Sequence, residues 1–472
     1  MLRELIIILK WALNTVYNGM NMKSFTKCCI VLSFIITVFS SELFPQEDNY
    51  WNIQYGTRST LLGGTVIGSV SDLSATYYNP GAIALFSDVK FIISAQAYQL
   101  DQYKIKNGAG EGRDLNYSSL TPSATFVAFN INFGFLKKDR IVVSILTRQS
   151  NQIEFNTRII DSIDVISSSP GKEDFAGGID YSQNFKDVWA GVTYSAKIND
   201  VIGVGATGYV AVKSYTNENI TLLEALQENG DIASYSKLFN YRYNNWRTLL
   251  KVGLGFNFTP VTLGLTVTSP SLNLFGSGSV GTHLFISGLD TNTFSSNYQD
   301  DIKSEYKTSW SAGFGAAYRK DKFKLHFSAE WYDAVEKFYV LDTQPYLSQS
   351  SNETLTNDLT HQTKSIINYG FGIDYFAADS LIFSASFISD YSSKNDDPGL
   401  NQPQSLGVNL FHISAGSTFK VWKSLLTIGA VYTYGSQNLE EIIDLVQGNS
   451  SEISSEAKLQ YSQIKVLIGF EL

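Results

Sequence analysis

Apolar and polar residues alternate along most of the chain from about residue 88 onward. Near the C-terminus the apolar residues recur at every second position, at Ile464, Val466, Ile468, Phe470 and Leu472. Successive side chains of a β-strand point to opposite faces, so this alternation predicts strands with one apolar and one polar face. A soluble β-sandwich and a membrane β-barrel both contain such strands, and the connections distinguish the two architectures.

Short and long connections alternate along the chain. The short ones lie at 137–139, 199–200, 259–260, 320–321, 378–379 and 421–423. The long, polar ones lie at about 104–117, 159–175, 217–237, 276–303, 342–360, 395–403 and 438–455. Strict alternation of this kind is typical of outer-membrane barrels, which have short periplasmic turns and long external loops.

Strand segments fill the spaces between these connections, at about 88–103, 118–136, 140–158, 176–198, 201–216, 238–258, 261–275, 304–319, 322–341, 361–377, 380–394, 404–420, 424–437 and 456–472. We therefore predict an all-β fold, a 14-stranded antiparallel transmembrane β-barrel over residues 88–472. An even strand count with the first and last loops outside places both termini in the periplasm of a Gram-negative-type cell. A soluble β fold is the alternative.

The first 40 residues have the features of a secretory signal. Lys23 and Lys27 precede a largely apolar run over 28–39, and Val38 and Ser40 supply the small residues of a cleavage site. Residues 1–40 are therefore predicted to be an N-terminal extension and signal peptide. Three methionines offer translation starts: Met1, Met20 and Met22. A membrane anchor is the alternative, although this apolar run is too short to span a bilayer.

Composition narrows the function classes. Charged residues make up 17% of the chain, against about 25% in soluble domains, and aromatic residues make up 14%. The formal net charge of -9 argues against a nucleic-acid partner, because phosphate binding needs a basic surplus. Both cysteines, Cys28 and Cys29, lie in the predicted signal, and the histidines are too scattered for a metal motif. We therefore expect no disulfide, no metal site and no cofactor.

Residues 41–87 are too few and too rich in glycine to form a domain, yet they end in apolar side chains that need burial. The stretch Asn79-Pro80-Gly81 predicts a tight turn, because proline fixes φ, glycine accepts a positive φ and the asparagine side chain bonds the backbone. Such a segment is stable only inside a larger structure. We predict that residues 41–87 form a small N-terminal hatch, or plug, in the barrel lumen.

The stretch 56–85 resembles the hatch of the FadL/TodX-type outer-membrane transporters of long-chain fatty acids and hydrocarbons. Its matching residues are Gly63, Gly64, Asp72, Ser74, Tyr78, Asn79, Pro80 and Gly81. Gly81 stands where that family usually has alanine, and fourteen strands is also the family's number. The resemblance implies a non-enzymatic channel for hydrophobic compounds, gated by the hatch. It implies an apolar ligand, outer-membrane lipid and the barrel-assembly machinery as partners.

The resemblance further implies that the third and fourth long loops capture the ligand. The third loop offers Leu222, Leu223 and Leu226, and the spacing of Thr221 to Glu224 predicts a short amphipathic helix there. The fourth loop offers Leu284, Phe285 and Ile286 on a polar, glycine-rich background. Exposed apolar residues suit a hydrophobic ligand, although packing against the barrel rim explains them equally well.

The exit path and the polarity of the ligand stay open at this point. The family releases its ligand sideways through a break in strand three, but residues 141–154 contain neither glycine nor proline. A carboxylate ligand would need an inward cation. Several basic residues face inward by parity, and none stands out: Lys197, Lys251, Arg319, Lys324, Lys420 and Lys465.

Two other functions are alternatives. Some FadL-like barrels serve as carriers or docking proteins in protein secretion, and long loops suit that use equally. The stretch His412-Ile-Ser414 is similar to the His-x-Ser spacing of the outer-membrane phospholipase. The alternation turns both side chains inward, away from the lipid, which disfavours a lipid hydrolase.

Overall fold

The computed structural model describes residues 48–108, 114–131, 139–163, 166, 171–288, 292–395, 407–439 and 457–472. The chain separates into two compact units, residues 1–41 and 42–472. The predicted signal peptide and both cysteines lie outside the described residues, and all that follows concerns the second unit. Within the described part of the chain, no helix is long and apolar enough to cross a membrane.

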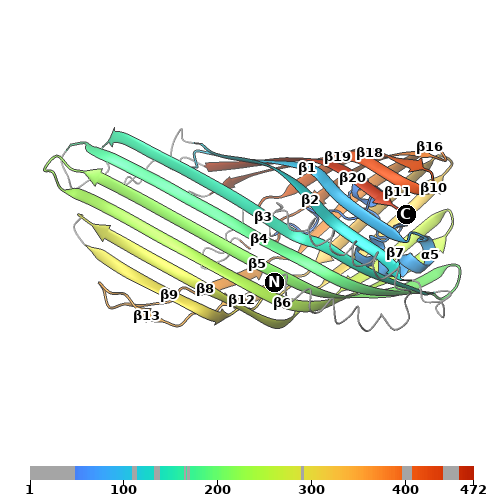
Figure 1. Ribbon diagram of the computed structural model, residues 1–472, viewed down its shortest axis with the longest axis horizontal. Helices are drawn as coiled ribbons and strands as arrows, with labels where there is room; N and C mark the ends of the chain where they lie inside the picture. The colour runs from blue at the N-terminus through green and yellow to red at the C-terminus, as the bar shows by residue number, and fades with distance from the viewer. Residues whose placement is uncertain are drawn as a thin grey trace, which may run out of the picture. The chain divides into compact units, whose positions relative to one another are not determined.

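Strands in one closed antiparallel ring form the body of this unit (Figure 1). β1 pairs with β20, and β5 pairs with β6, so no strand of the ring lacks a neighbour. The ring comprises β1 (Phe91–Lys106), β2 (Leu115–Ile131), β3 (Asp139–Ile163), β4 (Glu173–Lys197), β5 (Ile202–Leu226), β6 (Ile232–Phe258), β7 (Val261–Thr268), β10 (Ser311–Lys320), β11 (Phe323–Tyr332), β16 (Ile366–Ala378), β17 (Leu381–Asp390), β18 (Leu410–Val421), β19 (Ser424–Leu439) and β20 (Ala457–Glu471). The predicted 14-stranded barrel is confirmed.

The short turns lie where the sequence predicted them. Tight connections join β4 to β5, β6 to β7, β10 to β11, β16 to β17 and β18 to β19. The sixth predicted turn, 137–139, falls largely outside the described residues. All five described turns lie at the same end of the barrel, because successive strands are antiparallel.

The two faces of the barrel wall differ as the alternation predicted. On β11, Leu325 and Trp331 are exposed on the outer face, whereas His326 and Glu330 are buried inside. The same outward apolar positions continue around the ring and end in aromatic side chains at both rims, such as Trp310 and Phe323. An apolar band between aromatic girdles is the surface that a bilayer requires of a barrel.

The predicted helix in the third loop is wrong. Residues 217–226 continue β5 in full register with both β4 and β6, and only 227–231 form a turn. Leu222 and Leu226 are exposed on one face, while Leu223 packs into an inner apolar cluster from the other. This alternation of exposed and buried side chains is typical of a strand. Pairing with two neighbouring strands outweighs the weak helix signal of the capping-box spacing.

The predicted fourth loop is also largely strand. β7 stops at Thr268, and β8 (Leu272–Ser287) and β9 (Thr293–Lys303) form a hairpin that extends β6 beyond the ring. Figure 1 shows β3 to β6 reaching well past the ends of β1 and β20, with β8 and β9 beside them. Six strands therefore form a tall wall on one side of the barrel, bounded by β3 and β9.

A third departure from the prediction is a hairpin that folds inward. β12 (Val335–Leu341) pairs with β15 (Leu359–Thr363), and a small pair of β13 (Tyr346–Leu347) with β14 (Thr354–Leu355) lies between them in sequence. Phe338, Leu341 and Leu359 pack against the aromatic inner face of β4 to β6. We call β12 and β15 the inner hairpin.

A lysine at the middle of the apolar band should block assembly of the barrel. For Ile468→Lys on the outer face of β20 we expect a loss of about 2 to 4 kcal/mol, because the ammonium would face hydrocarbon. The control is Gln460→Lys on the same face of the same strand, near the native Lys458 and away from the band. The measurement is heat-modifiable migration of membrane fractions on gels. Equal folding of the two variants would contradict the assigned band.

Candidate functional site

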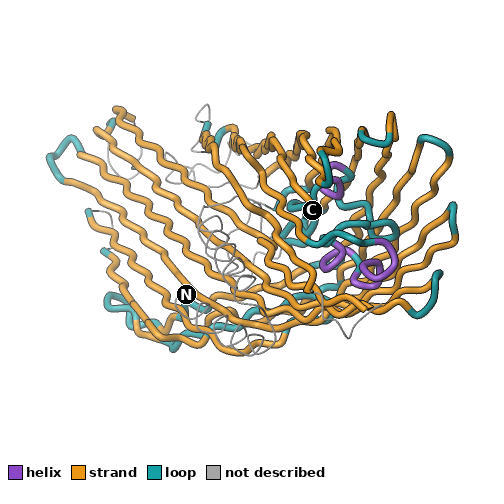
Figure 2. The backbone as a smooth tube through the Cα atoms, turned by 45° about the vertical axis from the view of Figure 1, so that its right-hand side comes forward, coloured by secondary structure: helices purple, strands orange, loops and turns teal. Residues whose placement is uncertain are grey.

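Residues 48–87 lie inside the barrel, and we call them the luminal segment. Its short helices are α3 (Arg58–Leu61), α4 (Ala75–Tyr78), η2 (Pro80–Ala82) and α5 (Ile83–Phe86). Figure 2 shows them enclosed by strands near the end of the barrel that holds the C-terminus. Most of their side chains are buried, although the segment has little apolar periodicity of its own. The barrel interior therefore supplies the core of this segment.

Asn79 joins two parts of the luminal segment to the wall. Its amide nitrogen donates to the carbonyl oxygens of Ile67, at 2.8 Å, and of Leu254 on β6, at 3.0 Å. Its amide oxygen accepts the N–H of Gly81 at 3.1 Å, which closes the turn around Pro80. The side chain of Asn79 thus makes three bonds, and the N–H of Ala82 adds a backbone bond to the carbonyl oxygen of Asn79 at 3.0 Å.

The turn sits on a wall surface made of glycines. A Cβ added to any of four strand glycines would overlap Asn79, Pro80 or Gly81, or another atom of the luminal segment: Gly203, Gly205, Gly253 and Gly264. Gly315 on β10 receives Ile67 and Gly68 in the same way. Backbone can approach backbone this closely only where no side chain intervenes. We call these five residues the glycine seat.

Asp72 and Ser74 act within the luminal segment. One oxygen of Asp72 accepts from both the backbone N–H and the hydroxyl of Ser74, and the other accepts from Ser59 of α3 at 3.1 Å. Burial raises the pKa of Asp72, and the hydrogen bonds from Ser74 oppose that rise. Tyr78 accepts the backbone N–H of Tyr55 at 2.8 Å. These contacts cross-link the turns of a segment that has no sheet of its own.

A second attachment joins the luminal segment to β11 and β16. Ser69 and Nδ1 of His326 are 2.7 Å apart, and Nε2 of His326 lies 3.1 Å from Asp374. Arg58 reaches the same carboxylate at 3.7 Å. The chain of contacts runs from the luminal segment into the wall and back. Sequence reasoning missed it, because Ser69 and His326 lie 257 residues apart.

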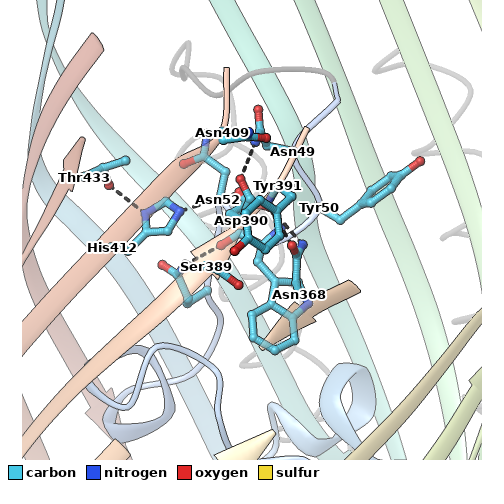
Figure 3. A network of polar contacts seen from close by, with 12 residues as sticks. Asn49, Tyr50, Asn52, Asn368, Ser389, Asp390, Tyr391, Asn409, His412 and Thr433 are labelled. Atoms are coloured by element: carbon cyan, nitrogen blue, oxygen red, sulfur yellow. Dashed lines mark hydrogen bonds and ion pairs between the residues drawn. The ribbon is translucent and has the colours of Figure 1, made fainter. Parts of the chain in front are cut away.

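The third attachment holds the start of the luminal segment (Figure 3). The side chain of Asn49 donates to the carbonyl oxygens of Asp390 and Val408, and the Asp390 carboxylate accepts the N–H of Trp51 at 2.8 Å. Lys465 donates to the carbonyl oxygen of Asn52 at 2.8 Å. Residues 48–52 are therefore fixed at the opposite end of β17 from its short turn.

His412 and Ser414 both point inward, as the alternation predicted, but they do not contact each other. His412 shares a 2.7 Å hydrogen bond with Thr433, and Ser414 donates to the carbonyl oxygen of Leu61 in the luminal segment. Ser414 also lies 2.5 Å from Ser386. Each residue therefore stabilises the barrel interior, and neither has the arrangement of a nucleophile with its base.

A chamber lies between the luminal segment and the inner hairpin. Its cavity volume is about 50 Å³, and it opens to solvent. Its lining includes Tyr50, Tyr77, Arg148, Asp187, Trp189, Lys251, Thr268, Tyr306, Lys307, Glu330, Tyr332 and His361. Aromatic rings with a few charged groups are the usual lining of a pocket for an apolar ligand with one polar end.

The acidic groups of the chamber are already paired. Glu330 accepts from Ser311, Tyr332 and Trp51 and lies 3.5 Å from Lys251. Asp187 forms an ion pair with Arg247 of β6 and accepts from Trp189. Both carboxylates therefore have a cation each, as buried carboxylates require.

Two cations of the chamber have no such carboxylate. Arg148 lies about 5.6 Å from the centres of the Tyr50 and Tyr77 rings and donates to the carbonyl oxygen of Tyr50. Among the described residues, neither Arg148 nor Lys307 forms an ion pair. Burial raises the pKa of Tyr77 to about 12, so this ring stays neutral beside Arg148. The chamber carries a surplus of positive charge.

None of the predicted loop residues lies in this chamber. Leu222, Leu226 and Phe285 are exposed on the tall wall, and Leu223, Leu284 and Ile286 are half-buried there. Sequence reasoning placed the hydrophobic contacts in the loops and missed Arg148, Trp189 and Tyr306. Parity alone marked Lys251 as inward, but it gave no sign of which inward residues would meet.

Comparison with known proteins finds similarity among solved structures. No family model matches the sequence, and no curated protein matches it. A Pseudomonas aeruginosa FadL homologue superposes with a TM-score of 0.55 at 14% identity, covering 89% of this chain and 99% of that one. The Pseudomonas putida toluene transporter TodX gives 0.53 at 13% identity, with 89% and 99% covered.

A TodX monoaromatic hydrocarbon channel carrying the deltaS2 change superposes with a TM-score of 0.60 at 14% identity, over 88% of this chain and 98% of that one. These values describe a common architecture over nearly the whole length of each partner. The chain therefore shares the fold of the FadL/TodX-type channels, a 14-stranded transmembrane β-barrel.

Proposed function

We propose that this protein is an outer-membrane channel through which hydrophobic compounds diffuse into the cell. The observation that carries the proposal is the chamber, an aromatic pocket enclosed in a barrel of the FadL/TodX-type fold. An apolar pocket inside a membrane barrel offers a hydrophobic compound a path that avoids the polar surface of the outer membrane. In this proposal the short turns face the periplasm.

The preferred substrates are amphipathic acids such as long-chain fatty acids. After the pairs Lys251–Glu330 and Arg247–Asp187 are formed, Arg148 and Lys307 remain without a carboxylate among the described residues. A buried cation is stable when an anion accompanies it. Nε and Nη1 of Arg247 also lack a described acceptor, which adds donors beside the chamber. A ligand carboxylate would satisfy these groups, and an alkyl chain would lie among the rings.

The luminal segment acts as the hatch of this channel. The glycine seat, the Ser69–His326–Asp374 contacts and the Asn49–Asp390 contacts fix it to three sides of the wall. A segment held in this way blocks straight passage toward the short turns. The ligand must therefore leave the chamber sideways.

The lateral exit is proposed to lie between β2 and β3. Their ladder ends at the pair Phe126–Leu146. Beyond it the described parts of the two strands pair with β1 and β4 but not with each other. β3 has an irregularity against β4 between Thr147 and Gln149, so a break exists here without glycine or proline. Arg148 occupies it and turns into the chamber. Beyond it, the rings of Tyr117 and Phe155 meet across the unpaired strands.

Crowding the glycine seat should make the channel leak. Gly264→Val would push the new side chain into the carbonyl group of Ile67, so we expect a displaced hatch and faster entry of a small polar dye. Asn79→Ala should act in the same direction, because it removes both bonds to carbonyl groups. The measurement is dye influx beside uptake of a fluorescent long-chain fatty acid in cells.

The matched control for the hatch is Gly208→Val on β5, where an added Cβ meets no atom within 4 Å. Its dye influx should equal that of the wild type. Unchanged influx in the Gly264 and Asn79 variants, with normal assembly, would remove the hatch from the proposal and favour the docking alternative.

Removing the charge of Arg148 should reduce the uptake of acids and leave the uptake of neutral compounds nearly unchanged. In Arg148→Met the carboxylate loses a charge-assisted hydrogen bond of about 1.5 to 3 kcal/mol, which is a loss of roughly 10- to 100-fold in affinity. Uptake of a fatty acid should fall by that order, whereas uptake of the alcohol of equal chain length should change little. Arg158→Met, on the exposed part of β3, is the control. A parallel loss for acid and alcohol would rule out carboxylate recognition.

A further inference from the structure

We infer that substrates reach the chamber through a side entrance in the barrel wall, between the first residues of β8 and the segment 304–310. We call this place the side entrance. The inference rests on the proposed transport function and adds to it the route of uptake. It places capture at the outer edge of the membrane instead of at the tips of the loops.

The wall changes partners at the side entrance. β7 pairs with β10 up to the pair Thr268–Ser311, whereas β8 pairs with β6 from the pair Leu272–Thr248 onward. No described residue of β8 pairs with β10. Residues 305–310 belong to no strand and fill the space between the two. The ring of backbone hydrogen bonds is therefore interrupted at this level.

Side chains close the interruption. The N–H of Ser271 donates to the hydroxyl of Thr308 at 3.0 Å, and the N–H of Thr308 donates to the hydroxyl of Ser271 at 3.2 Å. The side chain of Asn273 accepts the N–H of Tyr306 at 2.9 Å. Each such bond adds little to stability. The gap at Ser271 and Thr308 can therefore open while the strand ladders on either side of it stay paired.

The chamber reaches the surface at this gap. Lys307, Thr308 and Ser309 line the chamber together with deeply buried groups such as Lys251 and Glu330. Lys307 is itself exposed, and its ammonium lies 5.3 Å from the centre of the Phe338 ring of the inner hairpin. The neighbouring Trp310 is also exposed. The segment 307–310 thus joins the lining of the chamber to the exposed edge of β10.

An apolar patch lies directly outside the gap. Leu272, Leu274, Phe275 and Trp310 are exposed to 69%, 53%, 61% and 49%. On β6 the neighbours Trp246 and Arg247 pair with Phe275 and Asn273 of β8, so Leu274 is an extra residue without a pairing partner on β6. This irregularity leaves Leu274 and Phe275 exposed side by side. Leu272 pairs with Thr248, two residues beyond Leu250 of the apolar band. The patch therefore lies where the outer leaflet ends.

Among the described residues, the chamber is covered on its outer side by a packed apolar cluster. Above the chamber, the inner hairpin contributes Phe338, Val340, Leu341 and Leu359 to a buried cluster with the rings of β4 to β6. Opening this cluster would expose large apolar surfaces to water. Opening the side entrance breaks the bonds described above and the bond from the Ser271 hydroxyl to the carbonyl oxygen of Tyr306. The backbone bond from Ser304 to Gly276 marks the upper limit of the gap.

The occupant of the side entrance is the amphipathic acid itself. Its alkyl chain fits the apolar patch at the edge of the lipid, and its carboxylate fits Lys307 at the gap. From there the carboxylate moves toward Arg148, the second cation of the chamber without a carboxylate partner. The apolar patch outside the gap thus matches the alkyl chain of the acid, and Lys307 matches its carboxylate.

A reversible lock tests the route. In the double variant Ser271→Cys/Thr308→Cys, a disulfide would join β8 to the segment 304–310, and the chain has no other cysteine beyond Cys29. We expect uptake of a fluorescent long-chain fatty acid to fall to the level of cells without the protein after oxidation, and to recover after reduction. The control lock is Thr418→Cys/Thr427→Cys, whose native hydroxyls lie 2.9 Å apart between paired strands. Its oxidation should leave uptake unchanged.

A single-cysteine variant gives an independent result where the lock forms poorly. Lys307→Cys modified with a bulky maleimide should block uptake, whereas the same label on Trp422→Cys, in the turn between β18 and β19, should not. Full uptake by both the oxidised lock and the labelled Lys307 variant would overturn the side entrance and leave transport intact. No uptake by the wild type would instead overturn the transport function.

Discussion

Complete pairing of backbone polar groups is the constraint on which this structure depends. Inside a bilayer each unpaired N–H or C=O costs several kcal/mol, so strands cross only in a closed ring. The ring of β1 to β20 meets this condition through the apolar band. Pairing between neighbouring strands is interrupted in two places, beside Arg148 and beside Ser271. Side chains span both gaps: the rings of Tyr117 and Phe155 meet at the first, and Ser271 bonds Thr308 at the second.

The same constraint explains how the lumen holds its contents. A short segment such as residues 48–87 must find partners for its own backbone without a sheet. Asn79, Ser69 and Asn49 supply or receive these bonds at three points of the wall. The glycine seat lets the backbone approach the wall at the first of them. Because these wall positions are glycines and carry no side chain, they form a surface that the backbone of the luminal segment can contact.

The sequence was a good guide to whatever depends on neighbouring residues. Alternation and turn residues predicted the ring, its inward and outward faces and its five described short turns. The pattern Thr221-x-x-Glu224 misled, because pairing with β4 and β6 decides the conformation there. Glycines at alternate inward positions, as at Gly203 and Gly205, were a readable signal for a close approach. The meeting of Arg148 with Tyr77 and the inner hairpin was unreadable, since it depends on the closure of the whole barrel.

The two interruptions of the ladder bound the tall wall of β3 to β9 on its two sides. The chamber lies between them, with Arg148 and Gln149 at one interruption and Lys307 and Thr308 at the other. A compound that enters at one side and leaves at the other would cross the lumen above the luminal segment without displacing it. In a straight pore the luminal segment, fixed to the wall at three points, would block every compound that enters the chamber. A sideways route avoids this block. The tall wall between the two interruptions is held by its own strand pairing and by the inner hairpin, which packs against β4 to β6.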